Sequence, residues 1–181
     1  SKAYSLIEID ITRGNLDPLP IAVSPLFQDD NSKRNSINEL KIENVGSEIS
    51  LVVENNLKIS GLFNPLSKEA FLQKPDIAHL KPRFEDWALI KAQALITGKV
   101  TIEDKKLKVE FRLWDILAGR EMMALAFTTV PSNWRRVGHI ISDKVYERLT
   151  GEKGYFDTRI IYVSEEGPKT ARVKKLSLIH I

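Results

Sequence analysis

NWRRVGHIISDKVYERLTGEKGYFDTRIIYVSE, residues 133–165, is the stretch that decides the fold of this chain. Its first half predicts an amphipathic helix that Ser132 caps and Gly151 ends. An apolar strand is predicted to follow at 156–164. The buried stripe of the helix consists of Val137, Ile140, Ile141, Val145 and Leu149. The stretch therefore predicts where one domain closes and another unit begins.

A second strand is predicted at 171–179, after a turn at 165–168. The two strands would form an isolated hairpin, which is marginally stable in water by itself. We therefore expect residues 1–154 to form one α+β domain. Residues 155–181 are expected to be a fragment of a second unit.

Strict alternation of apolar and polar residues over 95–130 predicts a three-stranded antiparallel meander, with its first turn at Asp104 and Lys105. Further strands are expected at 6–11 and 21–27. A second long helix is expected from Ser47, as its cap, to Gly61, as its stop, with Val53 and Leu57 on its buried face. The predicted fold class is α+β: a mixed, largely antiparallel sheet packed with two main helices.

The remaining segments carry weaker signals. Residues 28–45 are polar and are predicted to form an exposed loop. Residues 62–82 hold three prolines and are predicted to be connective, with one helical turn at 67–71. A short helix is expected within 84–94.

Composition excludes several classes of function. The net charge of +3, from 27 basic and 24 acidic residues, is too small and too interleaved to indicate a nucleic-acid-binding protein. The absence of cysteine excludes disulfides, thiolate metal sites and thiol catalysis. No glycine-rich phosphate loop or nucleophile elbow is present. We therefore predict no catalytic residue, no cofactor and no metal site.

Several separated segments together resemble one protein family. These are PIAVSPL at 20–26, SGLFNPL at 60–66, and WRR, SDKVYERLTG and TRIIYV within the opening stretch. In this order they are similar to the N-terminal domain of the TolB family, periplasmic proteins of the bacterial Tol–Pal system. The resemblance covers residues 4–176. The tail at 176–181 departs from the family pattern, and the loop at 29–45 is longer than the pattern.

The resemblance implies a fold and a cellular role. The fold would be an α+β domain similar to the anticodon-binding domains of some aminoacyl-tRNA synthetases, followed by a six-bladed β-propeller that 155–181 would begin. The role would be that of a non-enzymatic periplasmic scaffold. It would support outer-membrane integrity, cell division and colicin import, and the propeller would bind the lipoprotein Pal and colicins.

The resemblance also assigns a partner-binding segment, which would engage the C-terminal domain of TolA. An alternating apolar face is suited to adding a strand to a partner's sheet edge. The alternative is that the segment is an ordinary edge strand of this domain, and the two arrangements can alternate. The predicted partner-binding residues, within 1–13, are Ile7, Glu8, Ile9, Asp10, Ile11, Thr12 and Arg13.

Two other groups in the opening stretch invite a chemical interpretation. His139 and Asp143 share one face of the helix, but two ligands are too few for a structural zinc site, so a hydrogen-bonded or surface pair is favoured. Trp134 with Arg135 and Arg136 favours capping and interdomain packing. RNA binding remains the alternative, by analogy with anticodon-binding domains.

Overall fold

The computed structural model describes residues 6–14, 17–157 and 177–180. These form a mixed sheet with strand order β3-β1-β4-β5-β6-β7, and β2 also pairs with β4. The elements, in chain order, are β1 (Leu19–Val23), β2 (Phe27–Gln28), α1 (Asp30–Leu40), α2 (Val45–Ile59), β3 (Phe63–Pro65), η1 (Lys68–Ala70), α3 (Pro75–Ala78), α4 (Phe84–Leu89), β4 (Ala94–Glu103), β5 (Lys106–Asp115), β6 (Arg120–Thr129), η2 (Pro131–Asn133), α5 (Trp134–Thr150) and β7 (Ser177–His180).

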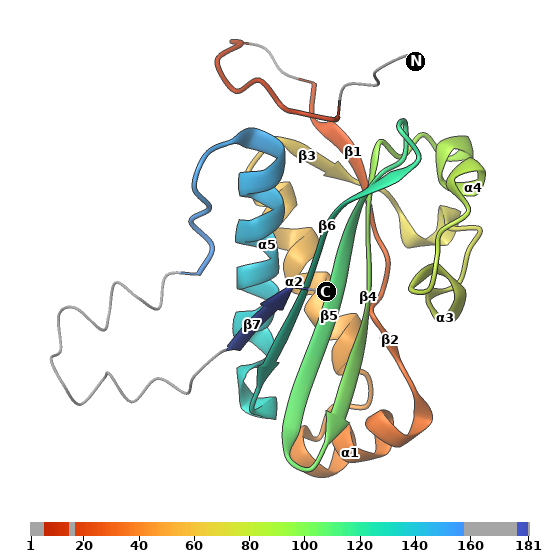
Figure 1. The fold of residues 1–181 in the computed structure, drawn as a ribbon, viewed down its shortest axis with the longest axis vertical. Coiled ribbons are helices and arrows are strands. Elements are labelled where there is room, and N and C mark those ends of the chain that lie inside the picture. Colours follow the sequence, from red (N-terminus) through yellow and green to blue (C-terminus); the bar gives the residue numbers. More distant parts are fainter. Residues whose placement is uncertain (1–5, 15–16, 158–176, 181) are drawn as a thin grey trace, which may run out of the picture.

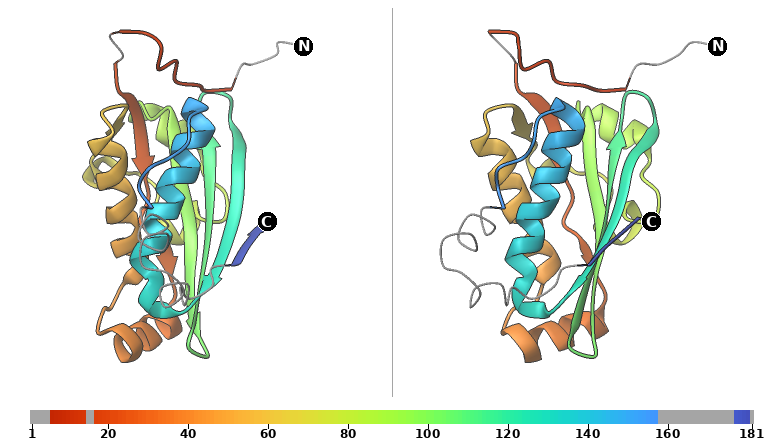
Figure 2. Two further views of the ribbon diagram at one scale, coloured as in Figure 1. Left: turned by 90° about the vertical axis from the view of Figure 1, so that its left-hand side faces the viewer. Right: turned by 60° about the vertical axis from the view of Figure 1, so that its left-hand side comes forward.

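The two long helices, α2 and α5, stand side by side on one face of the sheet (Figures 1 and 2). The short helices α3 and α4 lie on the other side of the sheet. Helix α1 lies at the end where β4 turns into β5 (Figure 1). The predicted sheet with two main helices is therefore confirmed. The likeness to anticodon-binding domains stays a prediction.

The predicted meander is present as β4, β5 and β6, all antiparallel. Asp104 and Lys105 both have positive φ, at 50° and 59°, which is the requirement of a tight two-residue hairpin turn. The register pairs Val100 with Val109 and Val109 with Phe127. Period-2 alternation thus places one apolar row of three strands on the face that α2 and α5 cover.

The N-terminal half of the sheet is parallel. β1 lies between β3 and β4 and runs parallel to both. The single strand predicted at 21–27 is divided: the Ser24 N–H still donates to the carbonyl of Ile96 on β4 at 3.0 Å, but the chain leaves the ladder at Pro25 before β2 resumes pairing with β4. Proline has no N–H to donate to a ladder, so the break falls at Pro25. β3 was not predicted: it has three residues, and the last of them is proline.

The two long helices end where the sequence predicted, but their N-terminal caps differ from the prediction. Gly61 and Gly151 end α2 and α5 in the left-handed conformation, both with φ of 76°, as expected. The cap of α2 is Asn44, whose side chain accepts a hydrogen bond from the Ser47 N–H at 3.0 Å, so Ser47 is not the cap. Ser132 lies within η2, a turn before α5 begins.

The prediction of an exposed loop at 28–45 is wrong, because α1 occupies most of it. The Asp29 carboxylate caps α1 by accepting from the Ser32 N–H at 2.8 Å. The face of α1 that packs inward carries serines instead of apolar residues. Ser32 and Ser36 are buried, and the Ser32 hydroxyl accepts the N–H of Ile102 at 3.1 Å. The sequence of α1 therefore has no apolar stripe, although one face of the helix is buried.

The core has two parts, one on each face of the sheet. The larger part lies under α2 and α5 and includes Ile21, Ile96 and Leu113. The smaller part lies under α3 and α4 and uses the alternate positions Ala22, Leu95 and Trp114, together with Trp87 of α4. The predicted helix at 84–94 and the predicted turn at 67–71 are present as α4 and η1. They form the cover of this second core.

The predicted C-terminal hairpin falls largely outside the described residues, since 158–176 are not described. Phe156 and Asp157 do not lie in a strand. Residues 177–180 form β7, which pairs antiparallel with β6 over 125–128, so this piece lies on the domain's own sheet and not apart from it. The division into 1–154 and a propeller fragment at 155–181 stays a prediction.

Candidate partner-docking segment

The predicted partner-binding segment lies across the end of the domain where α5 finishes (Figure 2). Its described part is extended but is not a β-strand, so the strand predicted at 6–11 is wrong. The Ile9 N–H donates to the carbonyl of Leu149 at 2.7 Å, and the Ile7 N–H donates to Asp115 Oδ2 at 3.0 Å. The last carbonyls of a helix have no partner within the helix, and the segment supplies one. It therefore binds a helix end instead of a sheet edge.

The predicted alternation of the segment is correct. Ile9 is only 8% exposed and joins the larger core, while Ile7 and Ile11 are half-buried against that core. Glu8 and Asp10 are exposed. The exposed set continues with Thr12 and Arg13, so the segment has an inner apolar edge and an outer polar edge.

A local turn organises the polar end of the segment. The Asp10 carboxylate accepts from the Thr12 hydroxyl at 2.6 Å and from the Thr12 N–H at 3.0 Å, and Arg13 lies 3.8 Å away. These bonds to Thr12, with the nearby charge of Arg13, lower the pKa of Asp10 below its ordinary value. An Asp side chain that bonds the backbone two residues ahead is a common turn device. It gives residues 10–13 a local turn.

Asp115, at the end of β5, is a residue that sequence reasoning missed. Its side chain is fully buried; Oδ2 accepts from Ile7, and Oδ1 accepts from the Ala118 N–H at 2.9 Å. One carboxylate thus ties the N-terminal segment to the β5–β6 turn. The signal in the sequence was an acidic residue placed directly before the turn at 116–119, where such side chains commonly bond backbone N–H groups.

A hollow of about 370 Å³ lies beside the segment, lined by Thr150 and Glu152 and by the residues 8–12. The segment is therefore not sealed into the body of the domain. Its contacts with the rest of the domain include the hydrogen bonds of the Ile7 and Ile9 N–H groups and the apolar packing of its isoleucines.

His139 and Asp143 do not act as a pair. His139 Nδ1 lies 2.9 Å from Asn56 Nδ2 on α2, whereas Asp143 accepts the N–H groups of Phe156 at 2.7 Å and Asp157 at 3.1 Å. The predicted pair is therefore wrong: each side chain is hydrogen-bonded, but to a different partner. Burial raises the pKa of Asp143 above its ordinary value, against the effect of these two N–H groups. No group of three or more metal-binding side chains occurs among the described residues.

The contact between His139 and Asn56 predicts a pH dependence of stability. An amide nitrogen only donates, so Nδ1 must accept and the ring must be neutral. Burial lowers the pKa of His139 below its ordinary 6.5, and Arg135 adds to this while Asp157 and Asp143 oppose it. The unfolded chain then takes up the proton at higher pH than the folded chain, so the free energy of unfolding should decrease as pH falls below about 6.5.

We expect His139→Gln to flatten this slope in urea titrations between about pH 7 and pH 5. His79→Gln should flatten the slope as well, because burial and Lys99 also lower the pKa of His79. An unchanged slope in His139→Gln would show that this histidine does not resist protonation.

The basic residues at the start of α5 are engaged within the chain. The Arg135 guanidinium lies 4.6 Å from the centre of the Trp134 ring, and Arg136 is 3.3 Å from the carboxylate of Asp157. Both members of the second pair are largely buried. These contacts lie within the chain and give the RNA-binding alternative no support. Asn133, not Trp134, is the cap position of α5, and interdomain packing stays a prediction.

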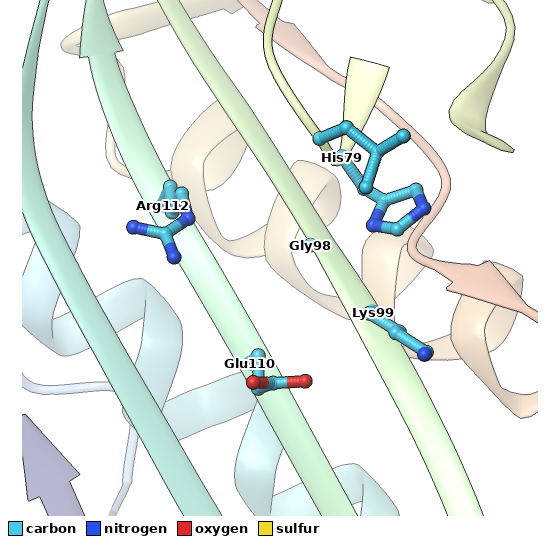
Figure 3. Close-up of a pocket in the computed structure, with 6 residues that line it drawn as sticks. His79, Gly98, Lys99, Glu110 and Arg112 are labelled. Atoms are coloured by element: carbon cyan, nitrogen blue, oxygen red, sulfur yellow. The ribbon is translucent and has the colours of Figure 1, made fainter. Parts of the chain in front are cut away.

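Another hollow, of about 280 Å³, lies on the open face of the sheet beside α3 (Figure 3). His79 lines one side and stacks on Phe27 with ring centres 4.7 Å apart. Glu110 and Arg112 on β5 line the other side, with Gly98 between (Figure 3). Glu110 pairs with Lys108 and Arg112 with Glu121, so these charges are already engaged in surface ion pairs. The hollow does not bring a nucleophile and a base together.

No helix among the described residues is long and apolar enough to cross a bilayer.

Comparison with known proteins agrees with the resemblance. The Tol-Pal system protein TolB of Pelagibacter ubique (strain HTCC1062) is 78% identical over 178 residues, which is 98% of this chain and 40% of the relative. The chain thus spans well under half the length of this relative. The crystal structure of TolB from Acinetobacter baumannii has the same fold, with a TM-score of 0.61 at 22% identity, over 78% of this chain and 30% of that one. The family model described as the TolB amino-terminal domain matches residues 7–122, more than half of the chain, and this chain therefore belongs to that family.

Proposed function

We propose that this domain is a non-enzymatic interaction module of the Tol–Pal system that docks a partner through residues 7–13. The observation that carries the proposal is the segment itself, with an apolar edge laid on the end of α5 and a polar edge in solvent. The 78% identical relative is a Tol-Pal system protein. The family suggests the C-terminal domain of TolA as the partner and the periplasm as the place.

The apolar edge of the segment can pack against this domain or against the partner, but not against both at once. Docking therefore requires that the segment be released from the domain. Releasing the segment loses the bond from the Ile9 N–H to the Leu149 carbonyl, at about 0.5–1.5 kcal/mol, and the bond from the Ile7 N–H to the Asp115 carboxylate, at about 1.5–3 kcal/mol. Exposing Ile9 costs about 1.5–3 kcal/mol more. A sum of a few kcal/mol is small enough for a partner to offset by adding the segment to its own sheet edge. The packed segment is then the resting state, and the docked segment is the active one.

The family also suggests a wider role for the whole protein. In the longer relative the remaining 60% of the protein lies outside the span matched here. We propose that a β-propeller after residue 154 binds Pal and colicins. The whole protein then supports outer-membrane integrity, cell division and colicin import.

The proposal predicts a binding defect that maps to the segment. We expect the TolA C-terminal domain, titrated into the ¹⁵N-labelled chain, to shift the amides of 7–13 together with those of Leu149 and Asp115. Deleting residues 1–13 should abolish binding. Asp115→Ala should strengthen binding severalfold, because it removes an acceptor that Ile7 uses only in the packed state.

Ile59→Ser is the matched control, since Ile59 is 77% exposed on α2, far along the chain from the segment. Its affinity should equal that of the unmodified chain. Equal binding by the chain lacking 1–13 would refute the assignment. Shifts centred on the sheet face would instead place docking elsewhere on the domain.

A further inference from the structure

The chain that leaves α5 does not move away from the domain. After Gly151 it reverses direction, and residues 154–157 lie back along the second half of α5 (Figure 2). We call these residues the strap. The strap has no regular secondary structure, so its placement depends on side chains of α5.

Two carboxylates of α5 hold the backbone of the strap. Asp143 accepts the N–H groups of Phe156 and Asp157 at 2.7 and 3.1 Å, one on each of its oxygens. Glu147, one turn further along, accepts the N–H of Gly154 at 3.2 Å. Hydrogen bonds from N–H groups to ionised acceptors are stronger than those between neutral groups. Three backbone groups of four consecutive residues are therefore tied to one helix.

A side chain of the strap also contacts α5. The Asp157 carboxylate lies 3.3 Å from Arg136, in the first turn of α5, and both side chains are largely buried, at 10% and 14% exposed. Removing one partner of a largely buried ion pair leaves an uncompensated charge. The strap is thus held at both ends, by Glu147 at Gly154 and by Arg136 at Asp157.

Packing leaves room only for glycine at the start of the strap. A Cβ on Gly154 would lie 2.5 Å from the Asp143 Cα and 2.5 Å from its Oδ1. On the outer side, the Tyr146 ring meets Tyr155 and Phe156 edge to face, with ring centres 5.6 and 6.0 Å apart. Edge-to-face aromatic pairs stabilise beyond the area they bury.

We propose that Asp143, Glu147 and Arg136 form a clamp that fixes the strap to α5, and that the clamp sets the direction of the chain at residue 157. The strap and α5 then behave as one rigid unit. Asp143 and Glu147 are positioning residues in this device. The inference does not depend on the proposed docking function, since it concerns the other end of the chain.

The test is amide hydrogen exchange and the ¹H–¹⁵N heteronuclear NOE of the 181-residue chain. In the unmodified chain, Phe156 and Asp157 should show NOE values equal to those of α5. In Asp143→Ala, we expect their amides to exchange at least tenfold faster and their NOE values to fall. Amides of α2, such as that of Val53, should be unchanged.

Glu147→Ala removes only the acceptor of the Gly154 N–H, so it should accelerate amide exchange at Gly154 alone. This distinguishes loosening of the strap from loss of stability of the helix. Gly154→Ala should release the strap with α5 intact, while Gly14→Ala, where a Cβ meets nothing within 4 Å, should have no effect. Unchanged exchange at Phe156 and Asp157 in both Asp143→Ala and Gly154→Ala would overturn the proposal. Acceleration across the whole domain in Gly154→Ala would also overturn it, because the strap would then be part of the core.

Discussion

Phe111→Ala is expected to lower the free energy of unfolding by about 3–5 kcal/mol, the usual cost of truncating a buried phenylalanine. Phe111 lies at the centre of β5, is 0% exposed, and stacks on Phe127 with ring centres 5.8 Å apart. It belongs to the core that α2 and α5 cover. The truncation removes dispersion contacts and leaves a cavity, because a closely packed interior relaxes only in part. Chemical denaturation followed by circular dichroism measures the loss.

Ile59→Ala is the control for this truncation. Ile59 is 77% exposed on α2, so its removal should change stability by less than about 0.5 kcal/mol. A loss below about 1 kcal/mol in Phe111→Ala would contradict the position of Phe111 in the core.

Gly98→Ala is expected to cost about 3 kcal/mol, although it adds only one carbon atom. Gly98 lies in the middle of β4. A Cβ there would be 2.2 Å from the carbonyl oxygen of Glu110 and 2.9 Å from Leu26 Cδ2. The carbonyl belongs to β5, the neighbouring strand, so it cannot move without distorting the ladder. The stability lost by overpacking against backbone should therefore lie at the upper end of the usual range of about 1–3 kcal/mol.

Two variants check the cause of that effect. Gly14→Ala should leave the midpoint of denaturation unchanged, because nothing lies within 4 Å of its Cβ position. Adding Leu26→Ala to Gly98→Ala should not restore stability, since it removes the contact with the side chain and leaves the contact with the carbonyl. Full recovery in this double variant would show that the backbone contact is unimportant.

The sequence predicted those parts of the fold in which one element has one periodic apolar face. The meander and the helices α2 and α5 follow this rule. In β5, for example, Leu107, Val109 and Phe111 recur every second residue, and in α5 Val137, Ile141 and Val145 recur every helical turn. Helix α1 was missed because Ser32 and Ser36 form its buried face. Its packing depends on a hydrogen bond to Ile102, which no local pattern reveals.

The candidate site was predictable only in part. Alternation correctly placed Ile9 inward and Glu8 and Asp10 outward. The acceptors that hold the segment and the strap are Asp115 and Asp143, and each bonds backbone N–H groups. A backbone N–H is identical in every residue except proline, so the sequence carries no sign of which one a carboxylate will meet. Such contacts became visible only when the chain was folded.

The position of β1 between β3 and β4 has a consequence for the order of folding. β4, β5 and β6 are neighbours in the chain, and closing a short loop costs little entropy. Ile21, by contrast, pairs with Ala94, roughly 70 residues later. On the ribosome β1 emerges first. One edge of LPIAV can pair with β3 once that strand is made, but the other edge has to wait for β4 to be synthesised. The N-terminal part of this chain is therefore where chaperones and self-association compete most directly with folding.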